Sequence, residues 1–303
     1  MKKIAITTTT FGEYDNSPLA LCKKNGFEVI LNPYGRKIKP DEILELAKDA
    51  MGLIAGVEPM TREVLLRLPS LKVISRCGVG LDNVDLKATA ELGIKVFNTP
   101  DAPTLAVAEL TVGLLLNLIR KVSLMDKDLH NETWRKRMGD LLFEKKVGII
   151  GFGRIGKKVA ELLKSFNCEI AYADPFVEDG LLGLKCLSKE DLLQWADIIT
   201  IHVSAKERIL GESEFQVMKK GGWLINTSRG EALDENVLYN ALKDRRLSGA
   251  ALDVFEKEPY TGKLSELENV ILTPHIGSYA KEARIRMELE AVQNLMKGLE
   301  EVK

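Results

Sequence analysis

The clearest indication of how this 303-residue chain folds comes from Val147-Gly148-Ile149-Ile150-Gly151-Phe152-Gly153-Arg154-Ile155-Gly156. A short run of β-strand character leads directly into a glycine-rich turn, and residues 157–164 then continue as a helix. In such a unit Gly151 permits the tight turn, Gly153 lets the backbone approach a pyrophosphate, and Gly156 lets helix and strand pack closely. The helix N-terminus favours the charge of the phosphate. The stretch therefore predicts a dinucleotide-binding unit.

An acidic residue follows the next predicted strand. That strand ends in Ala171-Tyr172-Ala173-Asp174, so Asp174 lies eighteen residues beyond Gly156. A carboxylate here can accept hydrogen bonds from the adenosine ribose hydroxyls, and it would repel a 2'-phosphate. Residues 175–177 supply no arginine to bind such a phosphate. The pattern favours NAD over NADP, and it disfavours the alternative of a glycine-rich turn without a ligand.

Strand-like and helix-like runs alternate in both halves of the chain. This alternation predicts an α/β fold with two doubly wound parallel-sheet domains. The expected strands are 3–7, 27–30, 52–55, 72–75 and 94–97 in the first domain, and 147–150, 169–173, 198–203, 223–226, 249–252 and 270–272 in the second. One long helix is predicted between the domains, from about Pro103 to about His130. A last helix within residues 279–299 is predicted to return to the first domain.

Composition and charge exclude several classes of protein. The chain has 43 Lys and Arg against 44 Asp and Glu, and no basic block to neutralise a nucleic-acid backbone. The longest apolar stretch, Leu110 to Ile119, is too short to span a membrane. The four cysteines form no C-x-x-C pair, and the three histidines show no metal-ligand spacing. We therefore expect a cytoplasmic protein with no nucleic-acid partner, no membrane span and no metal site.

Two further motifs follow the glycine-rich turn. The first is Trp223-Leu224-Ile225-Asn226-Thr227-Ser228-Arg229-Gly230-Glu231. The second runs from Gly249-Ala250-Ala251-Leu252-Asp253 to Glu258-Pro259 and is followed by Thr273-Pro274-His275-Ile276-Gly277. From Lys72 to its end the chain resembles the D-isomer-specific 2-hydroxyacid dehydrogenase family. The resemblance implies a catalytic trio of Arg229, Glu258 and His275.

These residue types suit the oxidation of a 2-hydroxy acid. A guanidinium at Arg229 can hold the substrate carboxylate and carbonyl oxygen in a fixed orientation. His275 can take the hydroxyl proton as hydride leaves, and Glu258 would orient the imidazole and stabilise its protonated form. Taken singly, each residue has an ordinary alternative. Arg229 could be a solvated charge on a loop, Glu258 one acid of a charged run, and His275 a histidine whose hydrogen bonds are made within the fold.

The resemblance also assigns the remaining positions. It implies a flavodoxin-like substrate domain, residues 1–98 plus 276–303, and an NAD-binding Rossmann domain, residues 99–275. The expected cofactor-binding residues are Gly151, Gly153, Arg154, Ile155, Gly156, Asp174, Val203, Thr227, Asp253 and Gly277, with Arg154 and Ile155 at the pyrophosphate and Asp253 at the nicotinamide carboxamide. Family members usually have Pro where this chain has Ser204, and the loop Ser204 to Leu210 is shorter, so the contacts on the adenine side are left open.

The stretch from Ser75 to Asp85 resembles the family's substrate loop. Backbone N–H groups of Gly78 and Val79 are expected to meet the substrate carboxylate. An arginine at Arg76 is similar to the phosphoglycerate dehydrogenase branch, where it helps to bind the substrate phosphate; the alternative is an arginine exposed at a strand end.

The predicted function is NAD-dependent hydride transfer on a D-2-hydroxy acid, with D-3-phosphoglycerate and 3-phosphooxypyruvate of serine biosynthesis favoured. A glyoxylate or hydroxypyruvate reductase, or a non-catalytic NAD-sensing module similar to the corepressors of this fold, are the alternatives. The resemblance further implies a homodimer built through the helix that contains Leu110 to Ile119.

Overall fold

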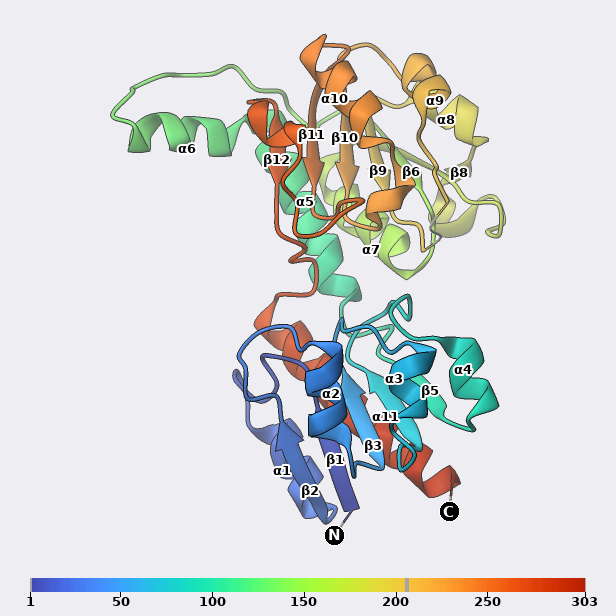
Figure 1. The fold of residues 1–303 in the computed structure, drawn as a ribbon. Helices are drawn as coiled ribbons and strands as arrows, with labels where there is room; N and C mark the ends of the chain where they lie inside the picture. Colours follow the sequence, from blue (N-terminus) through green and yellow to red (C-terminus); the bar gives the residue numbers. More distant parts are fainter. Residues whose placement is uncertain (1, 205–206, 303) are drawn as a thin grey trace. The chain divides into compact units, whose positions relative to one another are not determined.

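The computed structural model describes residues 2–204 and 207–302, which form two compact units. Unit 1 contains both ends of the chain, up to Pro103 and from Ser278 onward, and unit 2 is Thr104–Gly277. The boundaries predicted from the sequence, after residues 98 and 275, lie a few residues earlier. Each unit has its own sheet and its own helices (Figure 1).

Unit 1 is built on a five-stranded parallel sheet in the order β2-β1-β3-β4-β5. This is the flavodoxin-like order that the resemblance implied. The strands are β1 Lys2–Ile6, β2 Phe27–Leu31, β3 Gly52–Ala55, β4 Val73–Arg76 and β5 Lys95–Asn98. The helices are α1 Ser17–Lys24, α2 Pro40–Ala47, α3 Arg62–Leu66, α4 Leu86–Glu91 and α11 Lys281–Glu301.

Two apolar clusters cover the two faces of this sheet. Ile43 of α2 and Leu65 of α3 pack with Leu53 on one face. Cys22 of α1 and Met287 of α11 pack with Ile4 on the other. The last helix therefore does return to unit 1, where it contacts β3, β4 and β5.

Unit 2 is built on a seven-stranded parallel sheet in the order β12-β11-β10-β9-β6-β7-β8. The strands are β6 Lys146–Ile150, β7 Glu169–Ala173, β8 Lys185–Cys186, β9 Ile198–Ile201, β10 Gly222–Asn226, β11 Leu247–Leu252 and β12 Val270–Leu272. The helices are α5 Thr104–Arg120, α6 Val122–His130, α7 Arg154–Leu163, α8 Lys189–Trp195, α9 Glu212–Val217 and α10 Glu235–Lys243, with short 3-10 turns at Lys164–Phe166, Leu181–Gly183, Gly230–Ala232 and Lys263–Glu266. The strand order reverses between β6 and β9, which is where open α/β sheets of this type bind nucleotides.

Burial on both faces explains why the central strands of unit 2 are mostly apolar. Every residue of β9 is buried. Helices α8, α9 and α10 contribute to the apolar cluster on one face, and α5 and α7 to the cluster on the other. Both predicted doubly wound parallel sheets are thus confirmed.

The prediction of one long helix from Pro103 to His130 is wrong. Helix α5 ends at Arg120, Lys121 adopts a left-handed conformation with φ of 57°, and α6 begins at Val122. The side chain of Asn117 accepts a hydrogen bond from the Ser123 N–H and donates one to the Ser123 hydroxyl. These bonds satisfy polar groups at the new helix start, so the chain can turn without proline or glycine. Within unit 2, α6 and the loop after it extend away from the sheet (Figure 1).

The apolar residues of α5 lie mostly inside unit 2. Leu114, Leu115, Leu118 and Ile119 are all buried. Helix α5, through which the resemblance implied a homodimer, therefore buries much of its apolar surface within the unit. In the described residues, no helix combines the length and the apolar character needed to cross a membrane.

Candidate active site

The predicted site residues of unit 2 follow the carboxyl ends of its parallel strands. The glycine-rich turn follows β6, Asp174 follows β7, and His202 and Val203 follow β9. Arg229 comes after β10, Asp253 and Glu258 after β11, and His275 after β12. Because all these strands are parallel, their carboxyl ends share one edge of the sheet.

The glycine-rich turn is held by close backbone contacts. Gly151 has φ of +88°, and a Cβ added to it would lie 2.5 Å from the carbonyl oxygen of His202. A Cβ at Gly156 would lie 2.2 Å from the Gly151 oxygen. By contrast, a Cβ at Gly153 would meet no atom within 4 Å. The space in front of Gly153, at the N-terminus of α7, is thus open to a ligand, and the geometry fits a bound pyrophosphate.

Asp174 is fixed against this turn. Its Oδ2 accepts a hydrogen bond from the Phe152 N–H at 2.7 Å, and its Oδ1 accepts one from the Phe176 N–H at 2.9 Å. The carboxylate remains partly exposed. Each oxygen keeps a lone pair, so Asp174 can still accept bonds from ribose hydroxyls. Arg154 is exposed at the start of α7, and Ile155 and Val203 are half-buried.

The turn that carries Arg229 is organised by Asn226, a residue that the sequence analysis did not single out. The Asn226 oxygen accepts hydrogen bonds from the Ser228 N–H at 3.0 Å and the Ser228 hydroxyl at 2.8 Å. Its amide nitrogen donates to the Arg229 carbonyl at 2.8 Å. The signal was present, since an asparagine two residues before a serine is typical of an Asx turn. Arg229 itself is half-buried, and its Nη1 donates to the Ser228 carbonyl at 2.8 Å.

The hydroxyl of Thr227 lies inside unit 2. It shares a hydrogen bond of 2.8 Å with the hydroxyl of Thr111 on α5, and Thr111 donates to the Val107 carbonyl. Thr227 is 6% exposed. Its side chain therefore joins α5 to the end of β10, directly beside Arg229.

Glu258 and His275 are in direct contact. Nδ1 of His275 lies 2.9 Å from Oε2 and 3.1 Å from Oε1 of Glu258. The Phe255 N–H donates to Oε1 at 3.2 Å, which helps to fix the carboxylate. With Nδ1–H donating to Glu258, the Nε2 of His275 is left to take or give a proton. Both side chains are partly exposed, so a ligand can reach them.

Asp253 forms hydrogen bonds with residues on both sides of His275. Its Oδ1 accepts hydrogen bonds from the Thr273 hydroxyl at 2.6 Å and the Ile276 N–H at 2.8 Å. Its Oδ2 accepts one from the Gly277 N–H at 2.8 Å. His275 has φ of 55°, a left-handed conformation that costs a non-glycine residue about 1 to 3 kcal/mol. These bonds keep the turn in that conformation.

Asp253 is 1% exposed, and burial raises its pKa. It was expected to meet the nicotinamide carboxamide, yet both of its oxygens are used by the chain itself. The binding of the carboxamide by Asp253 therefore stays a prediction, while its contacts to the His275 turn are present in the structure.

The Arg229 and Glu258 loops pack tightly together. A Cβ added to Gly230 would lie 1.9 Å from the carbonyl carbon of Phe255. Only glycine fits between the two backbones at this point. The sequence motif contained Gly230, but nothing local showed that its partner would be Phe255.

In unit 1 the expected substrate loop is folded on itself. The Gly78 N–H donates to the Thr99 hydroxyl at 2.8 Å, so it is already engaged, whereas Val79 is 37% exposed and its carbonyl accepts from Asn98. Nη1 of Arg76 donates to the Cys77 carbonyl at 2.6 Å. A Cβ on Gly78 would overlap the Arg76 guanidinium. Arg76 thus stabilises its own loop, in addition to any role toward a ligand.

His202 and the four cysteines are not among the predicted site residues. His202 is buried, its Nε2 lies 2.9 Å from the Thr200 hydroxyl, and burial lowers its pKa to about 3. The four cysteines are all free thiols. Of the shorter loop Ser204 to Leu210, residues 205 and 206 lie outside the described residues. No cluster of three or more potential metal ligands occurs in the described ranges.

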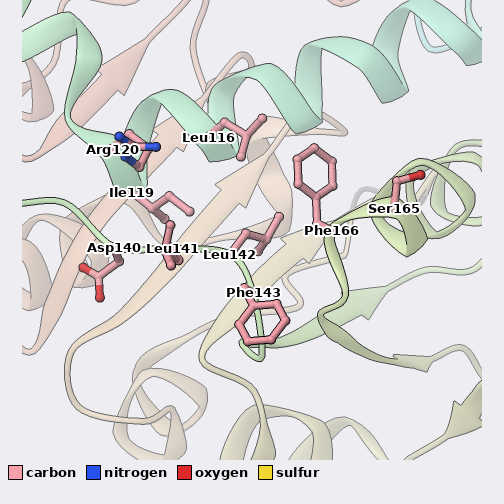
Figure 2. A pocket seen from close by; sticks show the side chains of 9 residues that line it. All are labelled: Leu116, Ile119, Arg120, Asp140, Leu141, Leu142, Phe143, Ser165 and Phe166. Atoms are coloured by element: carbon pink, nitrogen blue, oxygen red, sulfur yellow. The ribbon is translucent and has the colours of Figure 1, made fainter.

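Two pockets of unit 2 lie apart from these residues. A pocket of about 330 Å³ is lined mainly by apolar side chains of α5 and of residues 140–143, including Leu116, Leu142 and Phe166 (Figure 2). A larger one of about 990 Å³ is lined by α6, residues 131–140 and the region of β12. Neither contains a predicted site residue.

Comparisons with known proteins agree with this geometry. Residues 112–277 match the family model described as D-isomer specific 2-hydroxyacid dehydrogenase, NAD binding domain. The D-3-phosphoglycerate dehydrogenase of Methanocaldococcus jannaschii is 41% identical over 256 residues, which are 80% of this chain and 49% of that protein. The glyoxylate reductase of Thermococcus litoralis is 38% identical over 272 residues, 84% of this chain and 82% of that protein. This chain spans about half the length of the phosphoglycerate dehydrogenases it matches.

The similarity extends to whole structures. The crystal structure of the TT0316 protein from Thermus thermophilus matches with a TM-score of 0.91 at 34% identity, covering 99% of this chain and 97% of that one. The match to the family model covers more than half of the chain, and unit 2 has the strand order and the glycine-rich turn of a dinucleotide-binding domain. Sequence, geometry and comparison thus agree that this chain belongs to the D-isomer-specific 2-hydroxyacid dehydrogenase family.

Proposed function

We propose that the protein transfers hydride between NAD and a D-2-hydroxy acid or the corresponding 2-oxo acid. The observation that carries this proposal is the contact between Glu258 and His275 at the carboxyl edge of an NAD-binding sheet. NAD, when bound, supplies the hydride acceptor or donor. The open space at Gly153 and the fixed carboxylate of Asp174 suit its pyrophosphate and ribose.

The residues of the chain supply orientation and proton transfer. Glu258 accepts the hydrogen bond from Nδ1–H, so Nε2 of His275 takes the hydroxyl proton during oxidation and returns it during reduction. The carboxylate of Glu258 stabilises the imidazolium that forms. Arg229 binds the substrate carboxylate, because a guanidinium can form two parallel bonds to it.

We propose D-3-phosphoglycerate and 3-phosphooxypyruvate as the preferred substrate pair, which would place the protein in serine biosynthesis. Support comes from Arg76 and from relatives such as the D-3-phosphoglycerate dehydrogenase of M. jannaschii. Two observations favour a second candidate, a glyoxylate or hydroxypyruvate reductase. The Arg76 guanidinium is already engaged by the Cys77 carbonyl, and the chain covers most of the T. litoralis glyoxylate reductase.

A substrate panel tests both candidates. Consumption of NADH is followed by its absorbance with 3-phosphooxypyruvate, hydroxypyruvate and glyoxylate. Arg76→Ala should raise KM for the phosphorylated acid by about 10- to 100-fold, since a charge-assisted bond to phosphate is lost, and should leave glyoxylate nearly unchanged. A wild-type preference for glyoxylate, or an equal loss on both acids, would favour the reductase instead. No NADH oxidation with any acid would favour the non-catalytic NAD-sensing alternative.

We also propose that the protein is a homodimer. The support is a run of apolar side chains after α6 that are more than half exposed: Trp134, Met138, Leu141 and Phe143. Leu141 and Phe143 also line the smaller pocket (Figure 2). Sedimentation equilibrium should show a dimer for the wild type and a monomer for the double variant Met138→Asp, Leu141→Asp.

A cytoplasmic location is proposed as well, supported by the four free thiols.

A further inference from the structure

The loop that presents Glu258 is surrounded by acidic side chains. Asp234 precedes helix α10, Glu235 begins it, and Glu256 lies two residues before Glu258. The Glu256 N–H donates to the Glu235 carboxylate at 2.8 Å. Burial raises the pKa of Glu235, and the charges of Glu256 and Asp234 raise it further. These acids repel one another unless a cation lies between them.

Arg208 is that cation. Its Nη1 lies 2.8 Å from Oδ2 of Asp234, and its Nη2 lies 2.8 Å from Oε1 of Glu256. One planar guanidinium therefore binds two carboxylates that belong to different loops. A lysine has a single charged nitrogen and lacks this fork geometry.

The two ion pairs of Arg208 differ in which parts of the chain they hold together. Arg208 and Asp234 are already held together by the backbone, because the Ile209 and Leu210 N–H groups donate to Ala232 and the Asp234 N–H donates to Leu210. The bond to Glu256 is different, since it ties this fixed pair to the loop that carries Glu258. Loss of the guanidinium would remove the positive charge that now lies between Glu256 and Asp234.

We propose that Arg208 is a positioning residue, whose bridge between Asp234 and Glu256 holds the Glu258 loop so that Glu258 contacts His275. The inference rests on the proposed function for its catalytic consequence, but its structural content can be tested without turnover. Arg208 acts through Glu256 on the loop, and it is not itself assigned a contact with substrate or cofactor.

Histidine titration by proton NMR gives the direct test. The chain has three histidines; His202 is buried, His130 is exposed on α6, and His275→Asn identifies the His275 signal by its absence. If Glu258 moves away from His275, the imidazolium is less stabilised and the midpoint of the His275 titration falls to lower pH. If Glu258 does not move, removal of the positive charge of Arg208 alone would raise the midpoint of the His275 titration instead.

Two variants separate these effects. Arg208→Gln removes the cation, and Glu256→Gln removes its partner while keeping the cation. Positioning predicts a lower His275 midpoint in both, with His130 unchanged, whereas a pure charge effect predicts opposite shifts in the two. Arg208→Lys restores the charge without the fork and should recover only part of the wild-type midpoint.

Turnover supplies the second readout. Arg208→Gln should lower kcat about 2- to 5-fold, the range expected for exposed ion pairs, with the NADH Kd within about twofold of wild type. The matched control is Arg36→Gln, which breaks an exposed Arg36–Glu42 pair in unit 1 and should change neither quantity. An unchanged or raised His275 midpoint in Arg208→Gln would overturn the positioning role. If the midpoint falls but the wild type reduces no 2-oxo acid, the positioning role stands and the proposed function fails.

Discussion

Replacing Asp253 by Asn tests whether the backbone conformation of His275 sets the rate. The buried carboxylate accepts three hydrogen bonds, from the Thr273 hydroxyl and from the N–H groups of Ile276 and Gly277. An amide of the same shape has one acceptor oxygen, and its NH2 group would face at least one N–H donor. The variant therefore loses at least one of the bonds that hold His275 at φ of 55°.

The expected effect on stability is small because two contributions oppose each other. A hydrogen bond to a charged group stabilises by about 1.5 to 3 kcal/mol. Burial, however, raises the pKa of Asp253, so the ionised form is disfavoured at this position. We expect the free energy of unfolding at neutral pH to change by no more than about 1 kcal/mol.

The expected effect on rate is larger. Displacement of a reacting group by about 1 Å can cost about 100-fold. Because His275 lies between the bonded residues, loss of one bond should lower kcat about 10- to 100-fold. NADH binding should change much less than kcat, since the glycine-rich turn and Asp174 follow other strands and Asp253 is predicted to contact only the nicotinamide carboxamide.

The pH dependence of stability has a definite sign. The folded-state pKa of Asp253 lies above the ordinary value of 3.8, so the folded protein holds this proton more tightly than the unfolded chain does. The stability that this group contributes is fully present below pH 3.8 and is lost as the pH rises through the raised pKa. The wild type should therefore lose stability relative to Asp253→Asn as the pH increases across that window.

The measurements are kcat at saturating NADH, the NADH Kd by fluorescence, and urea denaturation at several pH values. Asp197→Asn is the matched control, since Asp197 accepts the Lys146 N–H and pairs with Lys219 at the opposite edge of the sheet. It should alter stability without altering kcat. A wild-type kcat in Asp253→Asn would refute the argument that these bonds place His275.

Three further variants test other parts of the site. His275→Asn, chosen because asparagine tolerates left-handed backbone, should lower kcat by about 10² to 10⁴ with NADH binding preserved; a loss below tenfold at every pH would remove His275 from proton transfer. Asp174→Ala should reduce the preference for NADH over NADPH by about tenfold or more in kcat/KM, and equal efficiencies in the wild type would contradict the assignment. Gly230→Ala should lower the free energy of unfolding by about 1 to 3 kcal/mol in urea denaturation, because its Cβ would overlap Phe255; an unchanged midpoint would show that the two loops can separate at no cost.

The fold was predictable because burial on both faces of a parallel sheet leaves a strong pattern. Every residue of the run Ile198–Ile201 is buried and three of the four are isoleucine, and the glycines after β6 mark a turn that other residues cannot adopt. The break at Lys121 was missed because it carries neither glycine nor proline, and its cause is the Asn117 side chain. Strand β8, Lys185–Cys186, was missed because two residues are too few to show a period.

The site was predictable only as far as its local motifs extend. Glu258 and His275 were expected to meet, and they do. Asp253 was predicted to face the cofactor. Its contacts with three donors of the loop after β12 could not be predicted, because nothing in its own motif indicates them. Arg208 had no motif at all, since its two partners are 26 and 48 residues away in sequence.

Two residues that follow strand β11 hold both the backbone and the imidazole ring of His275 in place. Asp253, directly after β11, holds the main chain around His275, and Glu258, farther along the same loop, holds Nδ1 of the imidazole. The backbone at His275 is left-handed, so a free loop would relax away from this conformation. Because β11 pairs with both β10 and β12, the two carboxylates share one rigid frame with Arg229. The edge of the sheet thus supplies the precision that the proposed proton transfer and carboxylate binding would require together.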